Sequence, residues 1–192
     1  AQILGGGSSS VTPHYVVTPF EGIKNRAGKK IKVDTVPGCH IYKNLPAPAP
    51  ETLSTEDGRL GLSLNLFNGT ECSGAPVYSE VTTKVQHGWF HHSVPNVNQS
   101  EFSMRMEGFF TPQESGIHEL SLEGVGWCKL YLDDEMIVDH SDDSDMGKQI
   151  VAEVELKGGK TYPIKVEYYW KGNPRWRSVA IGHQPPQPLD LI

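Results

Sequence analysis

The sequence predicts an all-β fold, a two-sheet antiparallel sandwich, for most of this 192-residue chain. Short runs in which apolar and polar residues alternate recur between residues 61 and 182, and turn-forming residues separate them. Glycine (20 residues) and proline (14 residues) are frequent and 37% of the residues are hydrophobic, which suits short strands joined by many turns. No helical repeat of useful length competes with this pattern.

The expected strands are bounded by residues that favour turns. Asn68-Gly69 is the strongest short turn signal, Asp133 to Glu135 reads as a hairpin turn, and Gly158-Gly159 reads as another. The segments expected to form strands are 31–36, 61–67, 101–110, 118–122, 129–132, 136–138, 150–156, 162–169 and 178–181.

The first 45 residues differ from the rest. Residues 5–10 are glycine and serine only and predict a flexible loop. A short helix is expected to open at Thr18-Pro19, because proline suits the first position of a helix. After Leu45, residues 46–50 alternate proline and alanine, as in a stiff, extended linker.

These patterns predict four parts of the chain. Residues 1–45 form a separate segment and residues 46–60 a linker, followed by the sandwich at 61–184 and a second linker at 185–192. The closing linker is rich in proline. We expect the chain to be an internal portion of a larger protein.

The net charge and the cysteine content limit which classes of partner and which cellular compartments suit this sequence. A net charge of −6 without a basic run argues against nucleic acid, and no apolar stretch reaches the length of a membrane span. Cys39, Cys72 and Cys128 are widely spaced and are expected as plain thiols or small core residues. Two glycosylation sequons, at Asn68 and Asn98, suit secretion, whereas free thiols suit the cytoplasm, so either location remains open.

Three ordered motifs carry a family resemblance. They are GFFTPQESG at 108–116, LYLDD at 130–134 and GKTYPIKVEYY at 159–169. Together they resemble the protective-antigen-type β-sandwich module, which is named after the anthrax toxin component. This resemblance implies a glycan-associated accessory module rather than a catalyst.

The first segment has a resemblance of its own. GGGSSSVTPHY at 5–15, TPFEGI at 18–23 and the stretch from Val33 to Cys39 are similar to part of the α/β-sandwich domain of glycoside hydrolase family 3 β-glucosidases. Some members of that family insert a protective-antigen-type module directly after this stretch. The order of segments here therefore resembles an enzyme piece followed by the inserted module.

The resemblance implies that this chain is not an enzyme by itself. In the β-glucosidase family, the nucleophilic Asp lies upstream and the acid/base Glu downstream of such a piece, so no catalytic residue is expected here. No cofactor is expected, and the acidic loop is expected to be solvated. Calcium is the alternative, since hard cations prefer several oxygen ligands. Its candidate ligands are Asp139, Asp142, Asp143 and Asp145.

Yeast adhesins with this module bind sugar through calcium held by two adjacent Asp residues just before the strand equivalent to 129–132. That place reads EGVGWC at 123–128 here, without the acidic pair. The resemblance therefore argues against a calcium-dependent lectin.

Two aromatic loops are candidates for sugar contact, because saccharides stack their C–H faces on rings while polar groups fix the hydroxyls. They lie at 87–92 and at 170–176. One tryptophan of each loop could instead close an end of the sandwich. The expected contact residues are Trp170, Lys171, Asn173, Arg175, Trp176, Trp89 and His91.

The function that the resemblance implies is a wall at the mouth of a β-glucosidase active site. Its expected partners are short β-linked gluco-oligosaccharides and the catalytic domains of the host enzyme. An independent carbohydrate-binding module or lectin is one alternative. A structural insertion for packing or dimerisation, which would form a homo-oligomer through the parent enzyme, is another.

Overall fold

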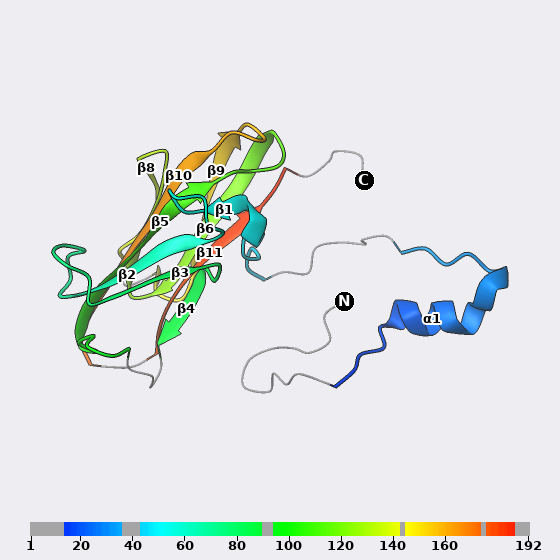
Figure 1. Cartoon of the computed structure of the whole chain (residues 1–192), viewed down its shortest axis with the longest axis horizontal. Coiled ribbons are helices and arrows are strands. Elements are labelled where there is room, and N and C mark those ends of the chain that lie inside the picture. The colour runs from blue at the N-terminus through cyan, green and yellow to red at the C-terminus, as the bar shows by residue number, and fades with distance from the viewer. Residues whose placement is uncertain (1–13, 36–42, 90–93, 143–144, 174–175, 187–192) are drawn as a thin grey trace. The chain divides into compact units, whose positions relative to one another are not determined.

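The computed structural model describes residues 14–35, 43–89, 94–142, 145–173 and 176–186 (Figure 1). The chain divides into two compact units, residues 1–41 and 42–192. Among the described residues, no helix is long and apolar enough to cross a membrane.

The first unit contains the expected helix, α1 (Pro19–Ala27), which is followed by one turn of 3-10 helix, η2 (Gly28–Lys30). Thr18 caps the helix: its Oγ1 accepts a hydrogen bond from the Glu21 backbone N–H at 3.2 Å, and the Glu21 carboxylate accepts from the Thr18 backbone N–H at 2.8 Å. This capping box satisfies two backbone donors that the first turn leaves open. The helix buries no residue.

The strand expected at 31–36 is not formed over residues 31–35, and residue 36 lies outside the described part. A strand needs a neighbour to satisfy its backbone groups, and no described segment pairs with this one. Ile31 is accordingly 63% exposed. The alternating pattern alone was insufficient to predict the strand.

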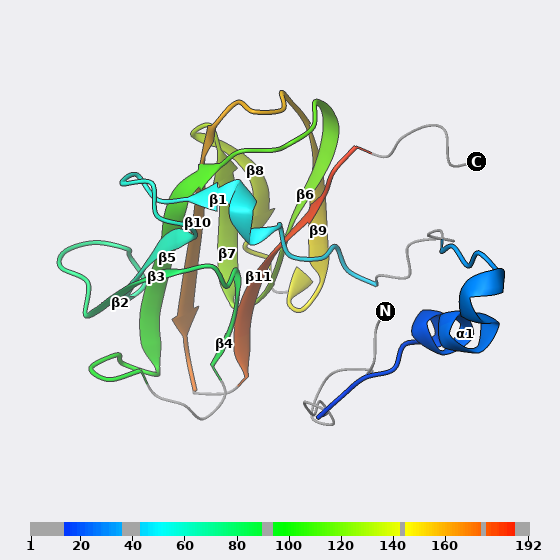
Figure 2. The same ribbon diagram turned by 45° about the vertical axis from the view of Figure 1, so that its right-hand side comes forward.

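The second unit is the expected two-sheet antiparallel sandwich, and its layers are visible in Figures 1 and 2. A short 3-10 turn, η3 (Pro50–Thr52), leads into it. In the larger sheet the strands β3, β2, β5, β10, β7 and β8 follow one another, and β1 pairs with β5. Their bounds are β1 (Leu53–Ser54), β2 (Leu62–Asn68), β3 (Tyr78–Thr82), β5 (Glu101–Phe110), β7 (Trp127–Leu132), β8 (Glu135–His140) and β10 (Tyr162–Lys171).

The smaller sheet has the strand order β4, β11, β6, β9. Strand β4 is an edge strand that pairs only with β11 among the described residues. The bounds of the four strands are β4 (Gln86–Trp89), β6 (Gly116–Val125), β9 (Gln149–Leu156) and β11 (Arg177–Gln184).

A single hydrophobic core fills the space between the sheets. Strand β10 shows the pattern that builds it, because its buried residues alternate with partly exposed ones from Tyr162 to Trp170. Phe102, Met104 and Met106 of β5 are likewise at most 1% exposed. Cys128 also lies in this core as a free thiol, where burial raises its pKa to about 12.

The turns predicted at Asp133-Asp134 and Gly158-Gly159 are confirmed, whereas Asn68 is the last residue of β2 and a longer segment connects it to β3. Asp133 and Asp134 have φ angles of 53° and 63°, as a two-residue hairpin turn of type I′ requires, and they join β7 to β8. Gly158-Gly159 forms the turn between β9 and β10.

Residues 46–60 were expected to be a linker, but the described structure packs them onto the sandwich. They contain η3 and β1, and Leu53 is completely buried. Strand β1 pairs with the end of β5, Leu53 with Phe110 and Ser54 with Phe109. This segment joins the core because its few apolar residues cover the end of the larger sheet.

Candidate functional site

One end of the sandwich gathers the described parts of both aromatic loops. Strand β10 ends there at Lys171, which pairs with Glu101, the first residue of β5. Strand β11 begins there at Arg177, which pairs with Trp89, the last residue of β4. The pairing of β4 with β11 therefore brings the segments around residues 89 and 176 together.

Trp176 provides the exposed ring of this site. Its side chain is 50% exposed, and its benzo ring lies against Gly88 of β4. A Cβ atom at position 88 would stand 2.9 Å from Trp176 Cη2, which is closer than real Cβ contacts allow. The glycine thus leaves the space in which the indole sits. Sequence analysis missed this role of Gly88, although a glycine within a strand signals close approach by another group.

Polar residues are found at the described end of β10 and directly after it. Asn173 is exposed, and Lys171 forms an ion pair with Glu101, with Nζ 3.4 Å from Oε1. The Gly172 backbone N–H donates to the Ser100 carbonyl at 2.9 Å, which ties the start of the loop to the segment before β5. These groups can donate to and accept from sugar hydroxyls.

Trp89 and Trp170, expected among the sugar contacts, belong to the core instead. Trp89 is 7% exposed, with its ring centroid 5.3 Å from those of Phe102 and Tyr168. Trp170 is 3% exposed because it continues the inward-facing positions of β10. One tryptophan from each loop therefore closes the sandwich, as the alternative interpretation held.

Arg177, which was not predicted from the sequence, holds two segments at this end of the sandwich together. Its side chain is 1% exposed and donates to the Gln99 carbonyl at 2.5 Å and to Gln99 Oε1 at 3.1 Å. The guanidinium also lies 5.5 Å from the centroid of the Phe102 ring. Burial lowers the pKa of Arg177, while its interaction with Tyr168 raises it. Arg177 thus fixes the segment before β5 to the beginning of β11.

His91 and Arg175, the remaining sugar-contact candidates, lie outside the described residues. The described histidine of the same loop is His87, whose Nε2–H donates to the Lys84 carbonyl at 2.8 Å, because a carbonyl oxygen can only accept. Burial lowers the pKa of His87, which favours the neutral ring.

The calcium candidates are not assembled into a site within the described part of the chain. Asp139 is 3.7 Å from Lys129 Nζ, and Asp145 is 3.5 Å from Lys148 Nζ. Asp143 lies outside the described residues. Among those described, no group of three or more His, Cys, Asp or Glu side chains is placed to hold a metal ion.

Comparison with known proteins extends over both units. The chain is 32% identical over 178 residues to a protein named probable β-glucosidase I from Neosartorya fischeri, and a protein of the same name from Aspergillus fumigatus is also 32% identical. In each case the match covers 88% of this chain and 21% of the relative. The chain therefore spans about one fifth of the length of these relatives.

A solved structure has the same fold. The β-glucosidase from Kluyveromyces marxianus, in complex with glucose, matches 97% of this chain and 23% of its own length, with a TM-score of 0.71 and 27% identity. The family model described as PA14 domain matches residues 58–189, which is most of the sandwich unit. This chain belongs to the PA14 domain family.

Proposed function

We propose that this chain is a noncatalytic accessory part of a β-glucosidase. In this role, the sandwich forms a wall at the mouth of the sugar-binding pocket and sets the length of substrate that the enzyme accepts. The names of the similar proteins support the β-glucosidase setting. The noncatalytic role rests on the family resemblance, because both catalytic carboxylates of that family belong to parts outside the matching segments.

A wall must be held rigidly. Three hydrogen bonds fix the segment at residues 44–46, through which the chain enters the sandwich. The Asn44 side chain donates to Glu123 Oε2 at 2.6 Å, and the Leu45 backbone N–H donates to Gln149 Oε1 at 2.8 Å. The His183 backbone N–H then donates to the Pro46 carbonyl at 2.8 Å. The last of these bonds joins the beginning of the unit to its final strand, which favours a fixed attachment over a flexible tether.

The observation that carries the proposal is the half-exposed indole of Trp176 on Gly88. A ring seated on backbone loses little conformational entropy when it binds a sugar, because it is already fixed. Short β-linked gluco-oligosaccharides present C–H faces that suit such a ring, and the exposed Lys171 and Asn173 belong to the same loop and can bind hydroxyls. The partners in this proposal are these sugars and the catalytic domains of the enzyme.

The test is a comparison of substrate lengths in the full-length enzyme. Trp176→Ala should lower kcat/KM for cellobiose about three- to tenfold relative to cellopentaose, since one stacking contact contributes about 1 kcal/mol. Trp176→Phe keeps a ring and should retain most of the preference. Ile117→Ala, an exposed apolar residue of β6, is the matched control on another part of the surface.

Unchanged length preference in Trp176→Ala, with normal folding, would refute the wall. A change in oligomeric state without any change in preference would instead support the structural insertion. Size-exclusion chromatography with light scattering on the same variants separates these outcomes.

A further inference from the structure

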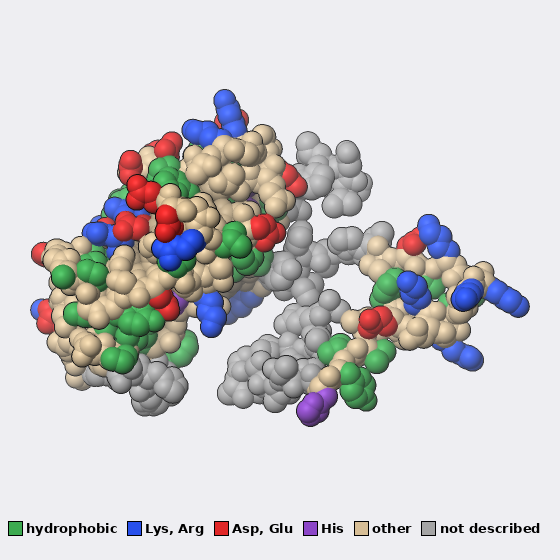
Figure 3. All heavy atoms as spheres, viewed as in Figure 1, with side chains coloured by type: hydrophobic (Ala, Val, Ile, Leu, Met, Phe, Trp, Pro, Cys, Tyr) green, Lys and Arg blue, Asp and Glu red, His purple; other side chains and the backbone are tan. Residues whose placement is uncertain are grey.

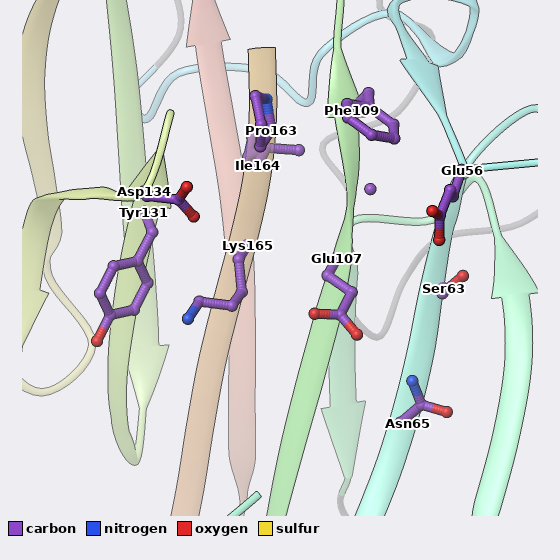
Figure 4. A pocket seen from close by; sticks show the side chains of 11 residues that line it. Glu56, Ser63, Asn65, Glu107, Phe109, Tyr131, Asp134, Pro163, Ile164 and Lys165 are labelled. Atoms are coloured by element: carbon purple, nitrogen blue, oxygen red, sulfur yellow. The ribbon is translucent and has the colours of Figure 1, made fainter.

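The outer face of the larger sheet carries side chains in ordered cross-strand rows. Ser63 pairs with Glu107, Glu107 with Lys165, and Lys165 with Tyr131, so that one row crosses β2, β5, β10 and β7. Ser63, Lys165 and Tyr131 each lie between two buried neighbours, and Glu107 follows the buried Met106, so the four side chains point away from the core. Figure 4 shows the four side chains next to one another on these strands.

This row lines a groove of about 360 Å³. Phe109 and Pro163 line it beside the row, and they too are cross-strand partners. A volume of this size is within the range of small-ligand sites and suits about one or two sugar rings. The groove lies on the outer face of the larger sheet, whereas Trp176 lies against β4, the edge strand of the smaller sheet.

The charges next to the groove neutralise one another. Glu167 Oε1 is 3.3 Å from Lys165 Nζ and 3.5 Å from Arg105 Nε, and Lys129 Nζ is 3.7 Å from Asp139 Oδ2. In the space-filling view, acidic and basic side chains are intermixed over the face that carries β5, β8 and β10 (Figure 3). On such a surface the hydrogen-bond donors and acceptors are fixed in position, and a ligand can bind without carrying a charge.

Aromatic rings frame the groove. The Lys165 ammonium lies 4.2 Å from the centroid of the Tyr131 ring, which fixes this half-buried ring at one end of the row. Tyr131 also lines a second hollow of about 320 Å³. That hollow contains the stacked rings of Trp127 and Tyr169, whose centroids are 5.0 Å apart and whose planes differ by 13°.

From this arrangement we infer that the outer face of the larger sheet is a second sugar-binding site, which takes a neutral oligosaccharide along the groove from Ser63 to Tyr131. Glu107 accepts hydrogen bonds from sugar hydroxyls, because Lys165 is paired with Glu167 rather than with it. The Tyr131 ring receives the C–H face of one sugar ring.

The charge of the groove selects against acidic ligands. Glu56, Glu107 and Asp134 line it together with the single cation Lys165, which gives the described lining a net negative charge. A polyanion such as an oligouronide or a nucleic acid would be repelled there. A neutral gluco-oligosaccharide meets no such barrier and can use the carboxylates as acceptors.

This inference goes beyond the proposed wall and does not depend on it. The test is direct binding of cellotetraose to the 192-residue chain, measured by isothermal titration calorimetry. The wild-type chain should bind, Tyr131→Ala should weaken binding at least tenfold, and Glu107→Gln should weaken it about fivefold. Tyr131→Phe, which retains the ring, should bind nearly as the wild type does. Ile117→Ala, at an exposed position on β6 of the other sheet, should leave this affinity unchanged.

Two results would overturn the inference: absence of cellotetraose binding to the wild-type chain, or binding that disappears in Trp176→Ala and persists in Tyr131→Ala. Tetragalacturonate serves as the anionic probe, and equal affinity for it would also contradict the site. Far-UV circular dichroism measures whether each variant folds. If Tyr131→Ala does not fold, the more conservative Glu107→Gln variant tests the inference instead. Because the wall is measured by substrate preference in the full enzyme, either proposal can fail alone.

Discussion

The benzo ring of Trp176 lies directly over Gly88, at a place where any other residue would project a Cβ atom into it. Trp176 directly precedes β11, which pairs with β4, and Ser178 of β11 is opposite Gly88 of β4. Their contact gives an exposed aromatic ring a fixed position on the rim of the sandwich. Its orientation therefore depends on the absence of a side chain at position 88.

Gly88→Ala should move the indole without unfolding the protein. The added methyl group meets the end of a half-exposed side chain, which can swing away, so we expect a stability change of at most about 1 kcal/mol. In a proton–nitrogen correlation spectrum, the Trp176 indole resonance should shift while the indole resonances of Trp89 and Trp170 stay in place. An unchanged Trp176 resonance would show that the contact does not orient the ring.

Arg177→Met should destabilise the sandwich by about 2–4 kcal/mol, because it leaves the Gln99 carbonyl and side-chain oxygen without their buried charged donor. Lys171→Met is the matched control, since it removes an ion pair on a side chain that is 68% exposed and should cost less than 1 kcal/mol. Urea unfolding of both variants measures the difference. Equal losses for the two variants would contradict a supporting role for Arg177.

The sandwich was predictable because its strands repeat a simple local pattern. The segment 101–110 was assigned with the bounds that β5 has, and the turn at 133–134 followed from its residues. Strand β3 and strand β4 were missed for a physical reason. Both lie at sheet edges, where fewer residues need to be apolar, and β4 carries Gly88 between two aromatic residues.

The site was less predictable, because a shift of one or two residues decides which ring is exposed. Strand β10 was expected to end at residue 169 but continues to Lys171, and this extension places Trp170 on the inward side. Trp176 lies one residue before β11, outside the strands, where alternation no longer applies. The outer-face row from Ser63 to Tyr131 depends on the register of four strands, which no local pattern in the sequence specifies.

Two buried histidines stabilise the junction where the chain enters and leaves the sandwich. His118 Nε2 lies 2.9 Å from the Glu114 carbonyl, which can only accept, so this nitrogen carries the proton. In the neutral ring, His118 Nδ1 then accepts a hydrogen bond from His183 Nε2 at 2.9 Å. Burial and the neighbouring His118 lower the pKa of His183 to about 4.

This pKa predicts loss of stability in mild acid. Below the ordinary imidazole pKa of about 6.5, the unfolded chain binds a proton that the folded His183 does not bind until about pH 4. The free energy of unfolding should therefore be unaffected by this group above pH 6.5. It should fall by up to about 1.4 kcal/mol per pH unit towards pH 4 and level off below.

Urea unfolding between pH 3.5 and 8 tests this prediction, with His183→Gln as the comparison. The variant should be less stable at pH 8 yet lose less stability on acidification. Glu51 and Glu114, which line the same cavity, are present in both proteins, so the difference between the two profiles isolates His183. Parallel profiles would refute the assignment.

Gly126 is the position at which we expect a single added methyl group to lower the stability of the sandwich the most. Its φ angle of 130° is one that other residues rarely adopt, and a Cβ atom there would overlap the ring and hydroxyl of Tyr168. Tyr168 cannot move aside, because it is completely buried and its hydroxyl donates to the Val125 carbonyl at 2.8 Å. Gly126→Ala should therefore cost about 2–4 kcal/mol from backbone strain and overpacking combined.

Gly159→Ala is the control that separates these two causes. Gly159 has a φ angle of 76°, and a Cβ atom there would meet nothing within 4 Å, so the substitution brings backbone strain without a clash. We expect it to cost only about 1 kcal/mol. The prediction is checked by urea unfolding, and equal costs for the two variants would mean that Tyr168 yields to the added methyl group. A larger cost for Gly126→Ala would establish that the Tyr168 ring is rigidly held at the end of β6.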